Sequence, residues 1–259
     1  MAVIASVGDN CIDRYVGAVE RESPGGNALN VAARSGGAYY GAVGDDEHGR
    51  AILAGALAAG TDMTNVEVRP GASGLTIVAL DEHGDRRFLL EQYGVAADYR
   101  LTPAIVGRLR DHPWVHAARQ PDLREAAPAL RSGETRLSYD FCDDWDDELV
   151  AALAPHLDVA FFSAGPEAAE RACALGATAG VATLGKDGSV AFSGSRRIAL
   201  AARPAIVVDT LGAGDAFIAA CIAGLADGLE LAAALELGGE SAAVACSHLG
   251  AWPEAVVTP

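Results

Sequence analysis

Residues 206–218 read IVVDTLGAGDAFI, and the interpretation of the whole chain starts from this stretch. A β-branched run, expected to be a strand, leads through a glycine-containing turn into an apolar-periodic segment, expected to be a helix. Gly212 and Gly214 let the backbone turn sharply and approach a ligand without interference from a Cβ atom. The NH groups of such a turn, beside a helix N-terminus, can bind the negative charge of a transferring phosphoryl group.

Asp215 follows this turn directly, in the expected first turn of the helix. A carboxylate there can accept the proton of an attacking hydroxyl while the backbone of Gly212, Ala213 and Gly214 stabilises the phosphate. The residues alone leave an alternative open. Asp215 would then only complement the helix dipole, and the glycines would only make a turn.

Two motifs carry a resemblance to a known family. Residues 209–215 (DTLGAGD) resemble the D-T-x-G-A-G-D signature of the ribokinase-like (PfkB) carbohydrate kinases, and residues 24–30 (PGGNALN) resemble their N-terminal glycine motif. Residues 41–46 and 183–188 extend the resemblance over nearly the whole chain. The implied activity is ATP-dependent phosphorylation of a sugar hydroxyl, with Mg²⁺ and, as a further option, K⁺.

The resemblance also implies a role for each matched residue. Asp215 is the catalytic base, and the backbone of residues 212–215 is the anion hole. The residues implied in sugar binding are Asp9, Asp13, Gly25, Gly26, Asn30 and Asp140. Those implied in ATP binding are Thr183, Gly185, Lys186, Gly188 and Thr210. Asp209 matches a position associated with a monovalent cation, with a strand-end cap as the alternative, and Asp13 and Asn30 have turn or cap duty as theirs.

Residues 180–187 (GVATLGKD) nearly match a Walker A loop, but Asp187 replaces the Ser or Thr that would bind Mg²⁺. A P-loop should open a helix, whereas strand-like runs at 181–184 and 189–192 flank this turn as in a hairpin. We therefore interpret it as a hairpin turn beside ATP. Lys186 either contacts a phosphate there or is a solvated turn lysine.

Many relatives carry an Asn-x-x-Glu motif that organises Mg²⁺ and phosphate, just after the strand expected here at 159–162. In this chain residues 163–167 read SAGPE, without the Asn and with the Glu one position late. Glu167 is thus expected either to act on the metal through water or, with Pro166, to favour a helix N-terminus.

The rest of the chain alternates short apolar runs with alanine-rich, helix-prone stretches, which predicts a doubly wound, mostly parallel sheet flanked by helices. Expected core strands are 2–7, 159–162, 181–184, 190–192 and 206–208. Expected helices are 50–59, 103–111, 146–154, 166–174 and 216–226. With the resemblance, this α/β pattern predicts one ribokinase-like domain over residues 1–259.

Two strand-like runs, 75–80 and 87–91, flank the turn DEHGD at 81–85, which predicts an antiparallel hairpin. We expect it to form a small β lid from residues 74–92, together with residues of about 13–20. Exposed lid edges could pair across a two-fold axis, which would give a homodimer.

The formal net charge of −16 repels the phosphate backbone of nucleic acids, so we expect no nucleic-acid binding. ATP is also an anion, so it must be held by local NH groups and Mg²⁺. The chain lacks a basic, apolar leader pattern and a run of 18 uncharged apolar residues, so we expect a cytoplasmic protein that does not associate with membranes.

Three stretches resemble one branch of the family, the fructoselysine 6-kinases: residues 6–13, 140–146 and 248–252. That branch implies transfer of phosphate to the 6-hydroxyl of a fructosyl-amine. The cationic amine of such a substrate would suit nearby carboxylates. Asp143, Asp144, Asp146 and Asp147 are nevertheless better explained as a solvated acidic loop and helix start. Trp145 either lines a pocket or packs against other side chains. One alternative is another PfkB-type sugar or nucleoside kinase. The other is a non-catalytic nucleotide or sugar sensor, and the retention of Asp215 argues against this sensor.

Overall fold

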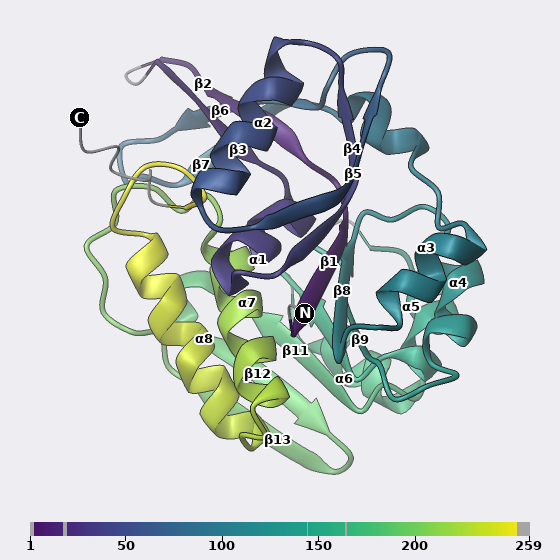
Figure 1. Cartoon of the computed structure of the whole chain (residues 1–259). Coiled ribbons are helices and arrows are strands. Elements are labelled where there is room, and N and C mark those ends of the chain that lie inside the picture. Colours follow the sequence, from purple (N-terminus) through teal and green to yellow (C-terminus); the bar gives the residue numbers. More distant parts are fainter. Residues whose placement is uncertain (1–2, 18–19, 144, 164, 253–259) are drawn as a thin grey trace.

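The computed structural model describes residues 3–17, 20–143, 145–163 and 165–252. In this part of the chain a nine-stranded sheet has the order β13-β12-β11-β10-β9-β8-β1-β4-β5 (Figure 1). Its strands are β1 (Ile4–Gly8), β4 (Ala38–Gly44), β5 (Asp62–Arg69), β8 (Trp114–Ala118), β9 (Arg136–Asp140), β10 (Val159–Phe162), β11 (Ala179–Thr183), β12 (Ser189–Ser193) and β13 (Arg196–Leu200). Neighbours from β5 to β11 are parallel, and β12 and β13 are antiparallel, which confirms the mostly parallel sheet.

Helices cover both faces of this sheet. They are α1 (Asn27–Ser35), α2 (Glu47–Ala58), α3 (Pro103–Leu109), α4 (Leu123–Leu130), α5 (Asp147–Leu153), α6 (Pro166–Ala174), α7 (Ala213–Ala226) and α8 (Leu231–Ala245), with 3-10 turns η1 (Gly94–Asp98), η2 (Ala154–His156) and η3 (Gly185–Asp187). All five expected helices are present, with ends shifted by a few residues. No helix in the described part of the chain has both the length and the apolar character needed to cross a bilayer.

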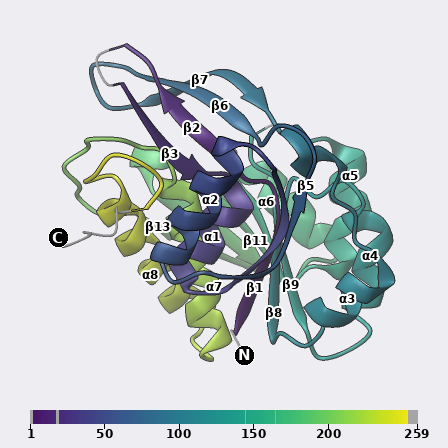
Figure 2. The same cartoon turned by 45° about the horizontal axis from the view of Figure 1, so that its top comes forward.

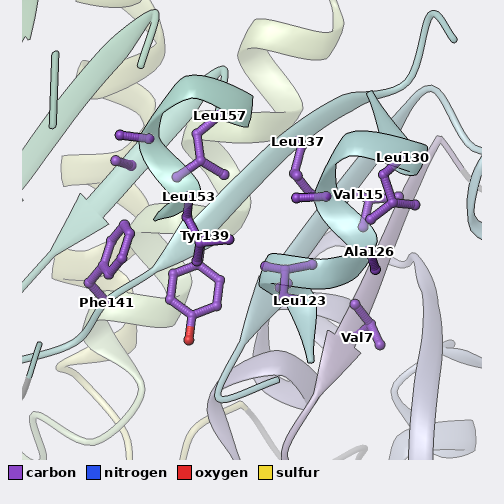
Figure 3. Close-up of a cluster of buried hydrophobic side chains, with 14 of the residues drawn as sticks. Val7, Val115, Leu123, Ala126, Leu130, Leu137, Tyr139, Phe141, Leu153 and Leu157 are labelled. Carbon is purple, nitrogen blue, oxygen red and sulfur yellow. The ribbon is translucent and has the colours of Figure 1, made fainter. Parts of the chain in front are cut away.

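Two hydrophobic cores lie on opposite faces of the sheet. On one face, side chains of α4 and α5 such as Leu123, Leu130 and Leu153 pack over Val115 and Leu137 of the sheet (Figure 3). On the other face, the apolar residues of α7 pack with α1, α8 and the sheet. The apolar-periodic segment predicted as a helix forms α7, and one of its faces is buried through Phe217, Ile218, Cys221, Ile222 and Leu225.

A second sheet of four strands, in the order β3-β2-β6-β7, lies above one edge of the domain (Figure 2). Its strands are β2 (Cys11–Tyr15), β3 (Arg21–Gly25), β6 (Leu75–Leu80) and β7 (Arg86–Gln92). The predicted β6–β7 hairpin is present, and β2 pairs in parallel with β6. The expected lid segment 13–20 thus includes the end of β2, while residues 18 and 19 lie outside the described residues.

One expected strand is wrong. Residues 206–208 form no strand: Ile206, Val207 and Val208 are 83%, 46% and 41% exposed. The amide of Val208 donates to the carbonyl of Cys246 at 2.8 Å, which ties the segment to the chain after α8. A β-branched run gives strand propensity, but strand formation also requires an available sheet edge.

The hairpin reading of residues 180–192 is confirmed. β11 and β12 pair antiparallel with Thr183 opposite Ser189, and the turn between them is η3. Because no α-helix follows β11 directly, the Walker A interpretation is correctly excluded.

Candidate active site

The candidate site lies where the chain reverses its winding direction about β1. This strand has β4 on one side and β8 on the other, and β9 follows β8. Ligands in open α/β sheets bind at the carboxyl ends of the strands at such a reversal. The residues that follow β1 and β8, and the last residue of β9, are therefore placed to meet a ligand, together with the N-termini of α1 and α7.

Asp215 occupies the first turn of α7 and is half-buried. The amide of Asn30, a buried residue of α1, donates from Nδ2 to Asp215 Oδ2 at 2.6 Å, so the two glycine motifs meet across 185 residues. Burial raises the pKa of Asp215 to about 7, as do the negative charges of Asp140 and Asp9, while Asn30 lowers it. A pKa near neutrality suits a general base.

The turn before Asp215 contains two glycines in different surroundings. Gly212 has φ of 75°, and a Cβ there would lie 2.7 Å from the Cα of Ala251. At Gly214 a Cβ would meet nothing within 4 Å outside the neighbouring helix backbone, so there is open space at this position. The amide of Ala213 donates to the carbonyl of Thr210 at 3.3 Å, and the assignment of this turn as an anion hole stays a prediction.

Asp13, on β2, is 3% exposed and faces Gly25 on the paired strand β3. A Cβ at Gly25 would lie 1.8 Å from Asp13 Oδ2, so only glycine leaves room for this carboxylate. Burial raises the pKa of Asp13 to about 7, and the charge of Asp215 contributes. The structure thus brings Asp13 close enough to Asp215 for the two charges to interact.

Asp9, just after β1, caps α1 from outside the helix. Its Oδ2 and Oδ1 accept from the amides of Asn27 and Ala28 at 3.1 and 3.0 Å. Gly26 has φ of 105°, and a Cβ there would lie 2.4 Å from the Cα of Asn10. Asp9 and Gly26 therefore fix the start of the helix that carries Asn30.

Asp140 ends β9 and is 4% exposed. Its carboxylate accepts from Asn27 Nδ2 at 2.5 Å and from the amide of Cys142 at 2.9 Å. Burial raises its pKa, while these hydrogen bonds and the charge of Arg119 lower it. Asp140 is thus held in place opposite the start of α1, and its role in sugar binding stays a prediction.

Asp209 is fully buried and organises the chain around the turn. It accepts from the hydroxyl of Tyr15 at 2.6 Å, and from the amides of Leu211 and Gly250 at 2.8 and 2.9 Å. Tyr15 belongs to the small sheet, so this carboxylate joins that sheet to the turn and to the C-terminal segment. Its assignment as a cation ligand stays a prediction.

Thr210 contacts the β6–β7 hairpin. Its amide donates to the carbonyl of Gly84 at 3.1 Å, and its hydroxyl and carbonyl accept from the amide and guanidinium of Arg86 at 3.1 and 3.2 Å. The hairpin therefore touches the turn beside Asp215. The predicted ATP contact of Thr210 is not tested by these bonds.

The other predicted nucleotide residues lie at or beyond the carboxyl ends of β10 and β11, two strands parallel to β9. Thr183 is half-buried and donates to the carbonyl of Phe162 at 3.4 Å, whereas Gly185 and Lys186 are exposed in η3 and Gly188 ends that turn. Glu167 is exposed in the first turn of α6. No group of three or more acidic, His or Cys side chains in the described part of the chain is arranged to hold a metal.

Sequence reasoning missed Asn27 and Arg119 as site residues. Asn27 lies inside the quoted glycine motif, so the motif itself was the signal. Arg119 follows β8, a strand that was not expected, and has φ of 46°. Its charge acts on Asp9 and Asp140.

The chain is similar to known sugar kinases along its whole length. It is 35% identical to fructoselysine 6-kinase from Escherichia coli over 97% of this chain and 100% of that protein. It is 32% identical to a fructosamine kinase from Bacillus subtilis over 96% and 92% of the two chains. Residues 146–255 match the sequence model of the pfkB family of carbohydrate kinases.

The fold is that of ribokinases. The structure of Arabidopsis thaliana ribokinase complexed with ribose and ATP matches with a TM-score of 0.83 at 21% identity, covering 96% of this chain and 94% of that one. Ribokinase from Giardia lamblia matches with a TM-score of 0.84 at 18% identity, covering 98% and 97%. The full-length relatives and the matched fold show that the chain belongs to the pfkB family of carbohydrate kinases and is an ATP-dependent sugar kinase.

Proposed function

We propose that the enzyme phosphorylates the 6-hydroxyl of a fructosyl-amine such as fructoselysine, with Asp215 as the general base. The observation that carries the chemistry is the Asn30–Asp215 hydrogen bond at the N-terminus of α7, beside the open space at Gly214. The observation that supports the substrate is the similarity to a fructoselysine 6-kinase and a fructosamine kinase over nearly the full chain.

The proposed reaction needs little rearrangement of protein groups. Asn30 fixes Asp215 Oδ2, which leaves Oδ1 to receive the proton of the attacking hydroxyl. Asp13 orients sugar hydroxyls from the space beside Gly25. The NH groups at 212–215 stabilise negative charge on the transferring phosphoryl group. ATP supplies that group, with Mg²⁺ to neutralise its charge, and Glu167 and Lys186 are the proposed protein groups on the nucleotide side.

The small sheet has two proposed roles. It is bonded to the segment before α7 through Tyr15 and through the β6–β7 turn, and from there it can cover the sugar and exclude water, which limits ATP hydrolysis. Its edge strand β7 exposes Phe88, Leu89 and Leu90. An exposed apolar edge strand favours pairing with a second copy, so we include a homodimer in the proposal. K⁺ near Asp209 belongs to the same proposal.

The test is release of ADP by the purified protein with Mg-ATP and K⁺, on fructoselysine, other fructosyl-amino acids, fructose, ribose and nucleosides. Asp215→Asn should abolish turnover while the protein stays folded. Asp227→Asn is the matched control, because Asp227 is exposed at the far end of the same helix. Preference for another sugar would reject the substrate, and unchanged turnover by Asp215→Asn would reject the base.

A further inference from the structure

A pocket of about 400 Å³ opens beside the proposed sugar site and is not needed for phosphoryl transfer. Asp9 and Asp140 form its inner wall, and it extends outward to Arg124 of α4 and to Asp146, which caps α5. Its wall also includes Tyr93 and Trp145. A sugar bound at Asp9 and Asp140 would therefore have space next to it for a substituent.

Two arginines line this pocket. Arg119 follows β8, and its guanidinium lies over the ring of Tyr93, 5.5 Å from the ring centroid. Arg124, in α4, is half-exposed and has an ion pair with Glu148 at 3.7 Å. The lining also carries the carboxylates of Asp9, Asp140 and Asp146, and the two guanidinium groups are the positive charges among the lining residues. A planar guanidinium group matches a carboxylate, so an anionic substituent would bind on the side of these two arginines.

The backbone at this wall is held in an uncommon conformation. Arg119 and Cys142 have φ of 46° and 55°, and they are the non-glycine residues with positive φ in the described part of the chain. Both line the pocket, at the ends of the neighbouring strands β8 and β9. Strained residues of this kind collect at ligand sites, where they orient side chains.

Gln120 supplies an independent indication of a ligand. It lines the pocket and is 4% exposed. Its Nε2 donates to the carbonyl of Tyr99 at 3.2 Å and to Asp122 Oδ1 at 2.6 Å, which fixes the orientation of the amide. Its Oε1 is buried and has no hydrogen-bond partner among the described residues. A buried acceptor in this state can take a donor from water or from a bound molecule, such as an ammonium group.

We propose that this pocket binds the amino-acid part of the fructosyl-amine, with its carboxylate on Arg119 and Arg124 and its free amino group at Gln120 Oε1. The hydrocarbon chain of the amino acid lies against Trp145 and Tyr93. This inference rests on the proposed function and adds to it that a free carboxylate is a specificity determinant. Unsubstituted fructose would leave the pocket without its ligand.

The test compares fructoselysine with its carboxylate-free counterpart, fructosyl-1,5-diaminopentane, in both turnover and calorimetric binding. The wild type should favour fructoselysine about tenfold in kcat/KM, as expected for one charge-assisted hydrogen bond. Arg124→Ala should lose this preference by slowing fructoselysine alone. Arg124 has an exposed side chain, so its variant should fold, and Arg50→Ala, an exposed arginine on α2, is the matched control.

The outcomes separate the two proposals. Equal kcat/KM for both compounds in the wild type, or an equal loss on both in Arg124→Ala, would overturn the carboxylate site and leave the fructosyl-amine kinase standing. Carboxylate-dependent binding without phosphorylation would support the pocket and reject the proposed reaction. Neither binding nor turnover of either compound would reject both.

Discussion

The pH dependence of catalysis tests the general base most directly. Asp215 must be ionised to accept a proton, and its pKa of about 7 lies well above the usual 3.8. Below pH 7 the ionised fraction falls tenfold for each pH unit, so kcat/KM at pH 5 should be about a hundredfold below its plateau. Above pH 8 the rate should level off, because Asp215 is then fully ionised.

Substitution of Asn30 shows whether this acid limb belongs to Asp215. The Nδ2 group donates to Asp215 at 2.6 Å and so stabilises the ionised carboxylate. Asn30→Ala removes a hydrogen bond to a charged group, which is worth about 1.5 kcal/mol, and should move the limb about one pH unit upward. The pKa values of ATP and of the sugar-amine cannot respond to this substitution, so a displaced limb identifies a protein group.

The matched variant is Asp13→Asn, because the pKa of Asp13 is also raised to about 7. The assay is quenched ADP release at saturating ATP between pH 5 and 9. A limb that persists near pH 7 in Asp13→Asn and moves in Asn30→Ala would confirm Asp215 as the base. A limb that vanishes in Asp13→Asn, or one that stays fixed in Asn30→Ala, would refute this reasoning.

Three further predictions concern stability and the anion hole. The pKa of Asp13 is higher in the folded than in the unfolded protein, so its contribution to the free energy of unfolding should fall as pH rises from about 4 to 7. Asp13→Asn should remove this contribution. Chemical denaturation at pH 8 should then show a free energy of unfolding higher by up to about 4 kcal/mol. Gly214→Ala should fold normally but lose at least tenfold in kcat/KM for ATP, whereas Gly212→Ala should lose about 2 kcal/mol of stability because of its φ of 75° and its contact with Ala251. Tyr15→Phe should cost about 1 kcal/mol in thermal unfolding, since Asp209 would lose one of three donors.

Much of the fold was predictable because the governing signals are local. Alanine-rich segments predicted five of the eight α-helices in the described part of the chain, and apolar runs predicted core strands of which four of five are present. The run at 206–208 failed for a tertiary reason: its main tie is to Cys246, and its side chains face solvent. Strand propensity says how well a segment suits a sheet, and it says nothing of whether an edge is free.

The site was predictable where sequence motifs meet and unpredictable where only tertiary structure assembles it. Asn30 and Asp215 stand in two recognisable motifs, and the structure joins them. Arg119 and Gln120 follow a short strand without a motif. Arg119 stands out by its positive φ, and Gln120 by a buried oxygen that has no hydrogen-bond partner among the described residues. Such features depend on packing between strands, so no local sequence pattern predicts them.

The glycines of the two motifs separate what the fold requires from what a ligand requires. At Gly25 and Gly212 a Cβ would collide with Asp13 or Ala251, so packing alone explains these residues. Gly214 is different, because it lies in the first turn of α7 and a Cβ there would meet nothing within 4 Å. Alanine would favour the helix by about 1 kcal/mol, so the fold gives no reason for glycine at this position. A phosphate that needs close approach to the backbone does give one, and this is why loss of ATP use without loss of stability in Gly214→Ala is the signature of an anion hole.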